Sequence, residues 1–292
     1  MYELIGITDK CHYIECPSRI GVVETGDGEV CFIDSGIDRS AAKRALKAIS
    51  ERGFRLKAVY NTHSHADHVG GNRYLYEQTG CKIYAPSVEC CSINHTFLEP
   101  ALLYGGNPMP GLRGKFMIAE ESPALPLTEE VLPECMTVVD LPGHTPGMVG
   151  YIVSDGTAYI GDAIAPESTL NKYGVFYLYD VAAYLESLCR LESLNARVYL
   201  PSHSAPIEDI GEIVNYNRQR IAEICDKIAE ICDTGKGFDE ILGGIFEAYG
   251  LEMTVEQYAL IGSTVRSYLS YLTDIEKIKA VIEDNRLKWQ KS

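Results

Sequence analysis

Residues 60–72 read YNTHSHADHVGGN and contain His63, His65 and His68 together with Asp67. The whole chain has seven histidines, so this segment holds nearly half of them. On extended or loop backbone, two histidines at positions i and i+2 can turn their ring nitrogens toward one point. An aspartate and a histidine that follow them can face a neighbouring point across a tight turn. This spacing favours two adjacent metal ions over a single ion.

The flanking sequence places this segment between a strand and a helix. LKAVY (56–60) is a short apolar run typical of a buried strand. VGGNRYLYEQTG (69–80) predicts a helix that ends at Gly80, and its paired glycines allow close backbone packing where the helix starts. The histidine-rich segment is therefore expected in a loop at the end of a sheet, where functional groups usually lie.

Strands and helices alternate on both sides of this loop. RIGVVETGDGEVCFIDSG (19–36) predicts a hairpin, and AAKRALKAISERG (41–53) predicts a helix capped by Asp38 or Ser40. This alternation predicts the α/β class. The later predicted elements are strands over CKIYAP (81–86), CMTVVDLP (135–142), MVGYIVSD (148–155), GTAYIGD (156–162) and ARVYL (196–200), with a helix over DVAAYLESLCRLESLN (180–195).

Two segments depart from the alternation. Residues 90–126 are rich in glycine and proline and show no sustained period, which predicts a long insertion or lid. Beyond about residue 208 the pattern predicts helices alone, over EIVNYNRQRIAEICDKIAEICDTG (212–235) and TVEQYALIGSTVRSYLSYLTDIEKI (254–278). We therefore expect one domain over residues 1–207 and a mainly helical region over residues 208–292.

The composition limits the class of protein. Hydrophobic residues make up 46% of the chain and charged residues 23%, as in ordinary globular proteins. There is no apolar run of about 18 residues and no basic-then-apolar N-terminus, so we expect no membrane association and a cytoplasmic location. The ten cysteines form no CxxC pair and are expected to be reduced and mostly buried. A net charge of −15 disfavours nucleic acid as a partner.

Three residues far along the chain occur in similar settings. His144 lies in LPGHTPG (141–147) and His203 in LPSHSAP (200–206), and each histidine follows a predicted strand in a loop of Pro, Gly and Ser. Asp162 ends the predicted strand YIGD and is the natural candidate for a carboxylate that bridges two ions. A purely structural role in a turn stays open for all three residues.

With THSHADH (62–68), PGHTPG (142–147), YIGD (159–162) and the SH pair at 202–203, the sequence resembles the metallo-β-lactamase fold superfamily over about residues 20–205. The resemblance implies a four-layer αβ/βα sandwich with a metal site at one edge. Here a C-terminal helical extension follows it. The pattern of this extension is also similar to the small winged-helix-like end of another branch of the superfamily.

The resemblance also implies how the residues divide between two metal ions. Zinc is the metal it favours, although manganese or iron could occupy such nitrogen and oxygen ligands. FIDSG (32–36) is similar to an early strand-end segment of the family, so that Asp34 is either a plain turn residue or a hydrogen-bond partner of a ligand histidine. The implied ligands are His63, His65 and His144 for the first ion, Asp67, His68 and His203 for the second, and Asp162 as the bridge.

The implied activity is hydrolysis of a small ester or thioester by a metal-bound hydroxide, with Asp67 and Asp162 orienting the nucleophile. THSHADHVGGNRYL (62–75) most resembles the glyoxalase II-like branch. The segment APESTLNKYGVFYLYD (165–180) differs from the corresponding glyoxalase II segment, and no matching basic pair is visible for glutathione. Another acyl carrier is therefore a further possibility.

Two alternatives stay open. The first is a phosphodiesterase or ribonuclease of the same fold, since six basic and four acidic residues lie between Arg266 and Ser292. The second is a non-catalytic binding protein whose helical tail forms a homodimer. A degenerate protein of this kind is expected to lose metal ligands, and this chain retains a residue of the implied type at all seven positions. The hydrolase is therefore the leading hypothesis.

Overall fold

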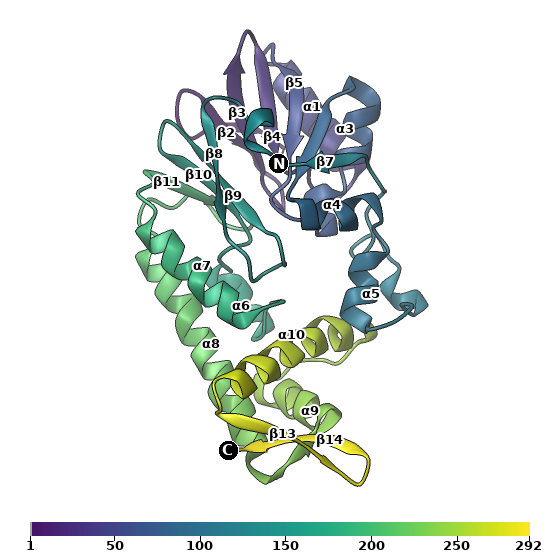
Figure 1. Cartoon of the computed structure of the whole chain (residues 1–292). Helices are drawn as coiled ribbons and strands as arrows, with labels where there is room; N and C mark the ends of the chain where they lie inside the picture. Colours follow the sequence, from purple (N-terminus) through teal and green to yellow (C-terminus); the bar gives the residue numbers. More distant parts are fainter. Residues whose placement is uncertain (1) are drawn as a thin grey trace.

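The computed structural model describes residues 2–292, in which two sheets pack face to face between outer layers of helices (Figure 1). The first sheet has seven strands that follow the order of the sequence, β1 to β7. The second sheet has four strands in the order β11-β10-β9-β8. This arrangement confirms the four-layer αβ/βα sandwich.

The register of the first sheet aligns the carboxyl ends of its parallel strands. Ile33 in β4 pairs with Tyr60 in β5, and Tyr60 pairs in turn with Tyr84 in β6. The loops that follow β4 and β5 therefore leave the sheet side by side. The strands are β1 (Leu4–Gly6), β2 (Cys11–Ile14), β3 (Ile20–Gly26), β4 (Glu29–Ile33), β5 (Arg55–Tyr60), β6 (Lys82–Ala85) and β7 (Ala124–Pro126).

The second sheet brings two further loops to the same edge. Its strands are β8 (Met136–Asp140), β9 (Val149–Val153), β10 (Thr157–Gly161) and β11 (Val198–Pro201). β10 and β11 are parallel, and Gly161 pairs with Pro201, so that the residues after both strands emerge together. β8 and β9 form an antiparallel pair connected by residues 141–148.

Side chains that alternate along the strands of the first sheet belong to two hydrophobic cores, one on each face of the sheet. In β4, Val30 and Phe32 pack toward the outer helices, whereas Cys31 and Ile33 pack between the sheets, as expected for a period of two. The first sheet is covered by α1 (Arg39–Ser50), α3 (Asn72–Thr79) and α4 (Ser87–Asn94), and the second by α7 (Val181–Ser193). The short α2 (Ala66–Val69) lies within the histidine-rich segment.

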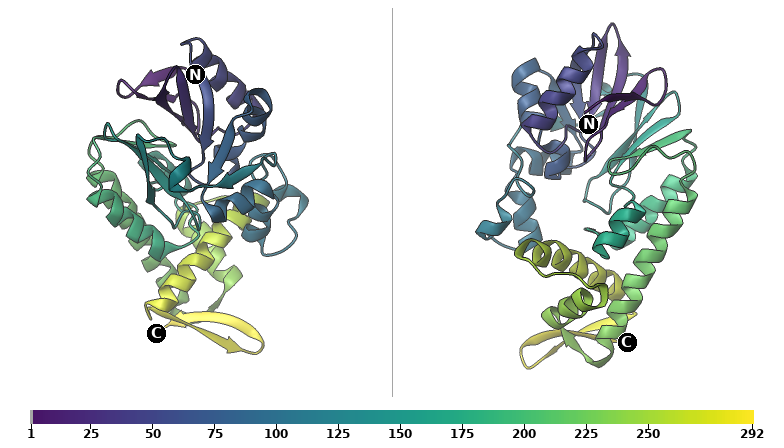
Figure 2. Two further views of the ribbon diagram at one scale, coloured as in Figure 1. Left: turned by 45° about the horizontal axis from the view of Figure 1, so that its top comes forward. Right: turned by 180° about the vertical axis from the view of Figure 1, so that it is seen from behind.

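The C-terminal region contains strands that the sequence pattern did not predict. The long α8 (Gly211–Ile231) packs on α7 and extends to one end of the molecule, where it meets α9 (Phe238–Tyr249), α10 (Val255–Asp274) and a three-stranded sheet (Figure 2). The expectation of helices alone was wrong because the chain turns back at Asp284 and Asn285, which both have positive φ, as a tight hairpin requires. The strands are β12 (Lys236–Gly237), β13 (Ile278–Glu283) and β14 (Arg286–Lys291), in the order β12-β14-β13.

The order of these C-terminal elements resembles a winged helix, with a helix, a short strand, two helices and a hairpin. The boundary predicted near residue 207 falls between β11 and α8. Division of the chain into two domains at that point stays a prediction. Within residues 2–292, no helix is both long enough and apolar enough to cross a membrane.

Residues 90–126 have more regular structure than their composition indicates. The segment includes most of α4, then α5 (Leu98–Tyr104), the 3-10 turn η1 (Pro110–Leu112) and β7. α5 and η1 contact α10, so this segment connects the first sheet to the C-terminal region. Two further short helices are η2 (Glu129–Val131) and α6 (Glu167–Tyr173), and a 3-10 turn, η3 (Cys232–Thr234), follows α8.

Candidate metal centre

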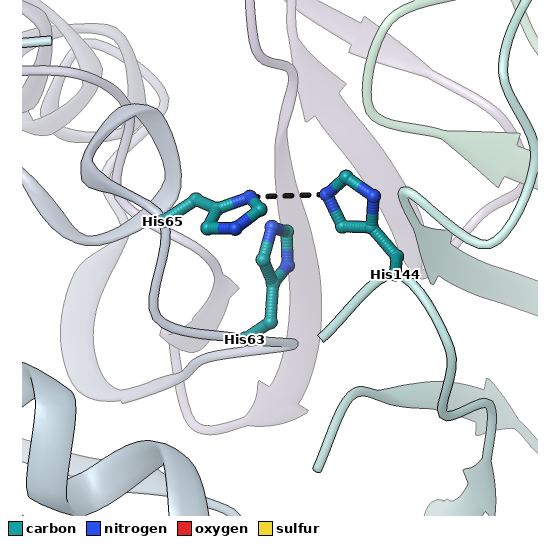
Figure 3. Close-up of side chains that lie close together, drawn as sticks. All are labelled: His63, His65 and His144. Atoms are coloured by element: carbon teal, nitrogen blue, oxygen red, sulfur yellow. Dashed lines mark hydrogen bonds between the residues drawn. The ribbon is translucent and has the colours of Figure 1, made fainter. Parts of the chain in front are cut away.

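Three histidines from two loops face one point at the edge of the sheets. His63 and His65 lie in the loop after β5, and His144 lies in the loop between β8 and β9. Figure 3 shows their rings turned toward one another, with His65 Nδ1 3.0 Å from His144 Nε2. One potential ligand atom from each side chain lies within 4.8 Å of the others. This geometry is compatible with a shared metal ion.

A second group lies directly beside the first. Asp67, His68 and His203 also present ligand atoms within 4.8 Å of one another. Asp162 lies between the two groups, because its Oδ2 is 3.3 Å from His203 Nε2 and 3.5 Å from Nε2 of both His68 and His144. The structure therefore brings all seven predicted ligands together.

Three buried atoms at this point have no hydrogen-bond partner within residues 2–292. They are Nε2 of His63, Nε2 of His68 and Oδ1 of Asp162. A buried polar atom without a hydrogen bond is unfavourable, and such atoms are rare in folded proteins. Their convergence fits the donor set that a divalent metal takes, and imidazole with carboxylate suits zinc, manganese or iron.

The other ring nitrogen of four of the histidines is held by a hydrogen bond. Such contacts fix the tautomer and direct the free nitrogen toward the metal. The Thr62 hydroxyl donates to Asp34 Oδ2 at 2.8 Å, so its oxygen accepts from His63 Nδ1 at 2.9 Å. The remaining contacts are His68 Nδ1 to Asp34 Oδ2 at 2.9 Å, His144 Nδ1 to the Tyr177 carbonyl at 3.0 Å and His203 Nδ1 to the Pro17 carbonyl at 3.0 Å.

Asp34 adopts a turn conformation and its side chain also contacts a candidate ligand histidine. It follows β4 with φ of 63°, and its side chain is buried. It accepts hydrogen bonds from His68, from the Thr62 hydroxyl and from the Thr62 backbone N–H at 2.8 Å. Of the two readings left open by the sequence, contact with a candidate ligand histidine is the one that the geometry supports.

The charges of the centre divide its histidines into two kinds. Burial lowers the pKa of His63 and His144, and it lowers that of His65 to about 3. Burial also opposes charge on His68, but the carboxylates around it outweigh this effect and hold its pKa well above the ordinary value. Asp162 raises the pKa of His203 to about 10. Asp67 and Asp162 therefore favour the imidazolium form of His68 and of His203 when no metal ion is bound.

Glu89 in α4 is a residue that the sequence analysis missed. It is 2% exposed, and its Oε2 accepts from the Ser64 backbone N–H at 3.0 Å. Its Oε1 accepts from the Thr145 hydroxyl and the Gly147 backbone N–H, both at 2.8 Å. One carboxylate thus connects the loop of His63 and His65 with the loop of His144. A lone acid in the otherwise apolar segment VECC (88–91) was the available signal.

Two further polar residues contact the candidate ligands. Ser18 donates its hydroxyl to Asp67 Oδ2 at 2.6 Å. Glu99 in α5 lies 3.8 Å from His65 Nε2, and burial holds the pKa of this carboxyl well above its ordinary value. Because α5 belongs to the segment 90–126, this segment contributes to the surroundings of the centre. Neither contact has a local sequence signature.

A cavity of about 460 Å³ opens on the centre. His144, Asp162 and His203 form one end of it. The rest of its wall comes from residues 164–166, from α6, from residues 175–177 and from α10. This volume lies within the range of small-molecule sites.

Known proteins are similar to this chain in sequence and in fold. A family model described as "Metallo-beta-lactamase superfamily" matches residues 13–203. A hydroxyacylglutathione hydrolase from Methylobacillus flagellatus is 31% identical over 44% of this chain, and the match spans only 42% of that relative. A probable metallo-hydrolase, YybB, from Bacillus subtilis is 28% identical over 72% of this chain and 90% of its own length.

Structural similarity extends over almost the whole chain. The metallo-beta-lactamase family protein TTHA1429 from Thermus thermophilus superimposes with a TM-score of 0.75, covering 98% of this chain and all of that protein. The two sequences are 18% identical, so the likeness concerns the fold alone. It includes the C-terminal region, because 98% of the chain is matched.

Proposed function

The chain belongs to the metallo-beta-lactamase superfamily of metal-dependent hydrolases, and we propose that it is a di-zinc hydrolase of small esters or thioesters. One observation carries the proposal. Seven ligand-type side chains converge at the edge of the two sheets, and three of their buried atoms have no hydrogen-bond partner among residues 2–292. The centre opens on a cavity of the size of a small-molecule site.

The proposed ligands divide into two sets around Asp162. His63, His65 and His144 would hold the first zinc ion, Asp67, His68 and His203 would hold the second, and Asp162 would contact both. When bound by these residues, two zinc ions would supply an activated water as the nucleophile and would polarise the carbonyl oxygen of the substrate. No serine or cysteine nucleophile is needed.

The protein's own residues keep this centre in one geometry. Asp34 orients His68 directly, and it orients His63 through the Thr62 hydroxyl. Ser18 holds one oxygen of Asp67, and Glu89 holds the two histidine loops together. We propose that Asp67 and Asp162 are the catalytic carboxylates that orient the attacking water.

Two findings support a carbonyl substrate. The relative from Methylobacillus is named for hydrolysis of an acylated glutathione, which is a thioester, although the match spans less than half of that protein. Within residues 2–292, no lysine or arginine lines the cavity beside the centre. The phosphates of an RNA substrate that lie beyond the proposed zinc ions would therefore have no cationic side chain beside them in this cavity. An ester or thioester with an uncharged acyl group makes no such demand.

A substrate screen with zinc-loaded protein tests the proposal. Thioesters, esters, lactones, phosphodiesters and short RNA are assayed with one preparation, beside Asp162→Asn as the inactive control. We expect hydrolysis of esters or thioesters in the wild-type protein and at least a hundred-fold lower rate in the variant, the order of effect seen when a group that stabilises the transition state is removed. Activity on RNA alone would overturn the preference for a carbonyl substrate.

A further inference from the structure

The cavity beside the metal centre has an apolar wall that continues away from the candidate ligands. Ile164 and Pro166 follow β10, Val175 and Phe176 follow α6, and Leu260 and Ile261 come from α10. Ile164, Val175, Phe176 and Ile261 are buried, and Leu260 is partly buried. A molecule in contact with the centre would therefore place its remaining atoms against hydrocarbon.

Hydrogen bonds attach α10 to residues 178 and 179 beside this wall. The Thr264 hydroxyl accepts from the Leu178 backbone N–H at 3.3 Å and donates to the Leu260 carbonyl at 3.1 Å. Further along α10, the Ser267 hydroxyl donates to the Tyr179 carbonyl at 2.8 Å. These contacts hold α10 against residues 175–179, so the C-terminal region supplies a fixed side of the cavity.

Charge is confined to one end of the cavity. In the described part of the chain (residues 2–292), the charged or titratable histidine and carboxylate groups that line it are His144, Asp162 and His203. The polar side chains elsewhere in the wall, such as Thr169 and Gln257, are neutral. A second carboxylate or a phosphate on a bound acyl group would lose its hydration without gaining a counter-charge, which is strongly unfavourable.

From these observations we infer that the cavity is an acyl-binding site that selects uncharged acyl groups of more than a few carbons, aliphatic or aromatic. The inference rests on the proposed ester or thioester hydrolysis. The carbonyl of the substrate faces Asp162 and the histidines, and its acyl chain lies against Val175, Leu260 and Ile261. The C-terminal region therefore sets acyl specificity through α10.

A series of thioesters on one small, uncharged thiol tests this inference. The acyl groups are acetyl, butyryl, hexanoyl, octanoyl, benzoyl and succinyl, and the thiol is N-acetylcysteamine throughout. Each methylene that becomes buried is expected to raise kcat/KM about four-fold, the factor that corresponds to about 0.8 kcal/mol. Hexanoyl should therefore exceed acetyl by roughly two orders of magnitude. Succinyl, which carries one free carboxylate, should fall below butyryl, which has the same number of carbons.

A matched pair of variants on α10 locates the effect. Leu260→Asp places a carboxylate in the wall, whereas Ser270→Asp places one on an exposed part of the same helix, outside this cavity. Leu260→Asp is expected to lower kcat/KM for hexanoyl at least about ten-fold more than for acetyl. Ser270→Asp should show the same dependence of kcat/KM on acyl chain length as the wild-type protein. Equal profiles for both variants would contradict the role of α10.

A binding measurement separates this inference from the proposed function. Acetate, hexanoate and octanoate are titrated into zinc-loaded protein by calorimetry, which needs no turnover. If no thioester is hydrolysed but the longer acids bind more tightly than acetate, the proposed function is overturned and the acyl site is supported. Hydrolysis with no preference for chain length, together with equal binding of the three acids, supports the proposed function and overturns the acyl site.

Discussion

His68 Nδ1 lies 2.9 Å from Oδ2 of Asp34, and both side chains are buried beneath the candidate metal centre. The same carboxylate accepts from the Thr62 hydroxyl, whose oxygen in turn accepts from His63 Nδ1. Asp34 therefore orients one proposed ligand of each zinc ion. A carboxylate behind a ligand histidine also raises the basicity of the metal-facing nitrogen.

Removal of Asp34 should weaken zinc binding. Asp34→Ala leaves His68 and the Thr62 backbone N–H without an acceptor, so zinc affinity is expected to fall about 10–100-fold in competition with a chelator. Asp27→Ala is the matched control, because Asp27 also has positive φ but is exposed in a hairpin turn. Unchanged affinity in Asp34→Ala would exclude this role.

Glu89 should couple the two histidine loops. In Glu89→Gln, an amide NH₂ replaces one carboxylate oxygen and must face either the Ser64 N–H or the Thr145 and Gly147 donors. At least one hydrogen bond is then lost, because two donor groups face each other without an acceptor. The free energy of unfolding is expected to fall by about 1–3 kcal/mol, and zinc affinity should fall with it. Denaturant unfolding checks this, with the exposed Glu120→Gln as the control. Identical unfolding of the two variants would contradict the prediction.

Gly70 should tolerate no side chain. A Cβ at this position would lie 2.0 Å from the Ile37 carbonyl oxygen and 2.7 Å from that of Ala66, both of which are backbone atoms. Gly70→Ala is expected to lower the free energy of unfolding by about 3 kcal/mol or more. At Gly106 a Cβ meets no atom within 4 Å, so Gly106→Ala is the control. A melting temperature of Gly70→Ala equal to that of the control would show that the loop adapts.

Zinc binding should release protons at pH 7. In the metal-free protein the pKa of His203 is about 10, and that of His68 also lies well above its ordinary value. These raised pKa values stabilise the metal-free fold fully below about pH 6.5, and for His203 the effect is lost as pH rises toward 10. Zinc requires neutral imidazole, so its affinity should fall as pH is lowered.

Titration calorimetry in buffers of different ionisation enthalpy counts the protons released. At least about two protons per chain are expected at pH 7, one from each imidazolium, and ionisation of a zinc-bound water would add to this number. His65, with a pKa of about 3, should contribute none. A binding enthalpy that is the same in all buffers would contradict the prediction.

The positions of the seven candidate ligands could be predicted because their motifs resemble those of the superfamily and lie in loops near the ends of clearly patterned strands. His63, Asp162 and His203 come directly after or near the ends of β5, β10 and β11. These strands belong to two different sheets, so the local sequence indicated loops at strand ends, and the resemblance was needed to expect one shared site. The alternation of strands and helices was sufficient to predict the α/β class, whereas the four layers followed from the resemblance to the superfamily.

Features that depend on contacts distant in sequence could not be predicted. Glu89 accepts hydrogen bonds from Ser64 and Gly147, which lie 25 and 58 positions away from it in the sequence. No spacing rule relates these residues. α10 forms part of the cavity wall only after the C-terminal region packs on the rest of the chain. The helical period of residues 254–278 did not reveal that α10 ends at Asp274. The residues between Asp274 and the start of β13 at Ile278 continue the same alternation of apolar and charged side chains.

Zinc stoichiometry of the purified and reconstituted protein tests the two-metal centre most directly. Two zinc ions per chain are expected in the wild-type protein. His68→Ala and Asp162→Ala should retain the circular dichroism spectrum of the wild-type fold while holding at most one ion. A wild-type metal content near zero, or a single tightly held iron, would contradict the proposed centre.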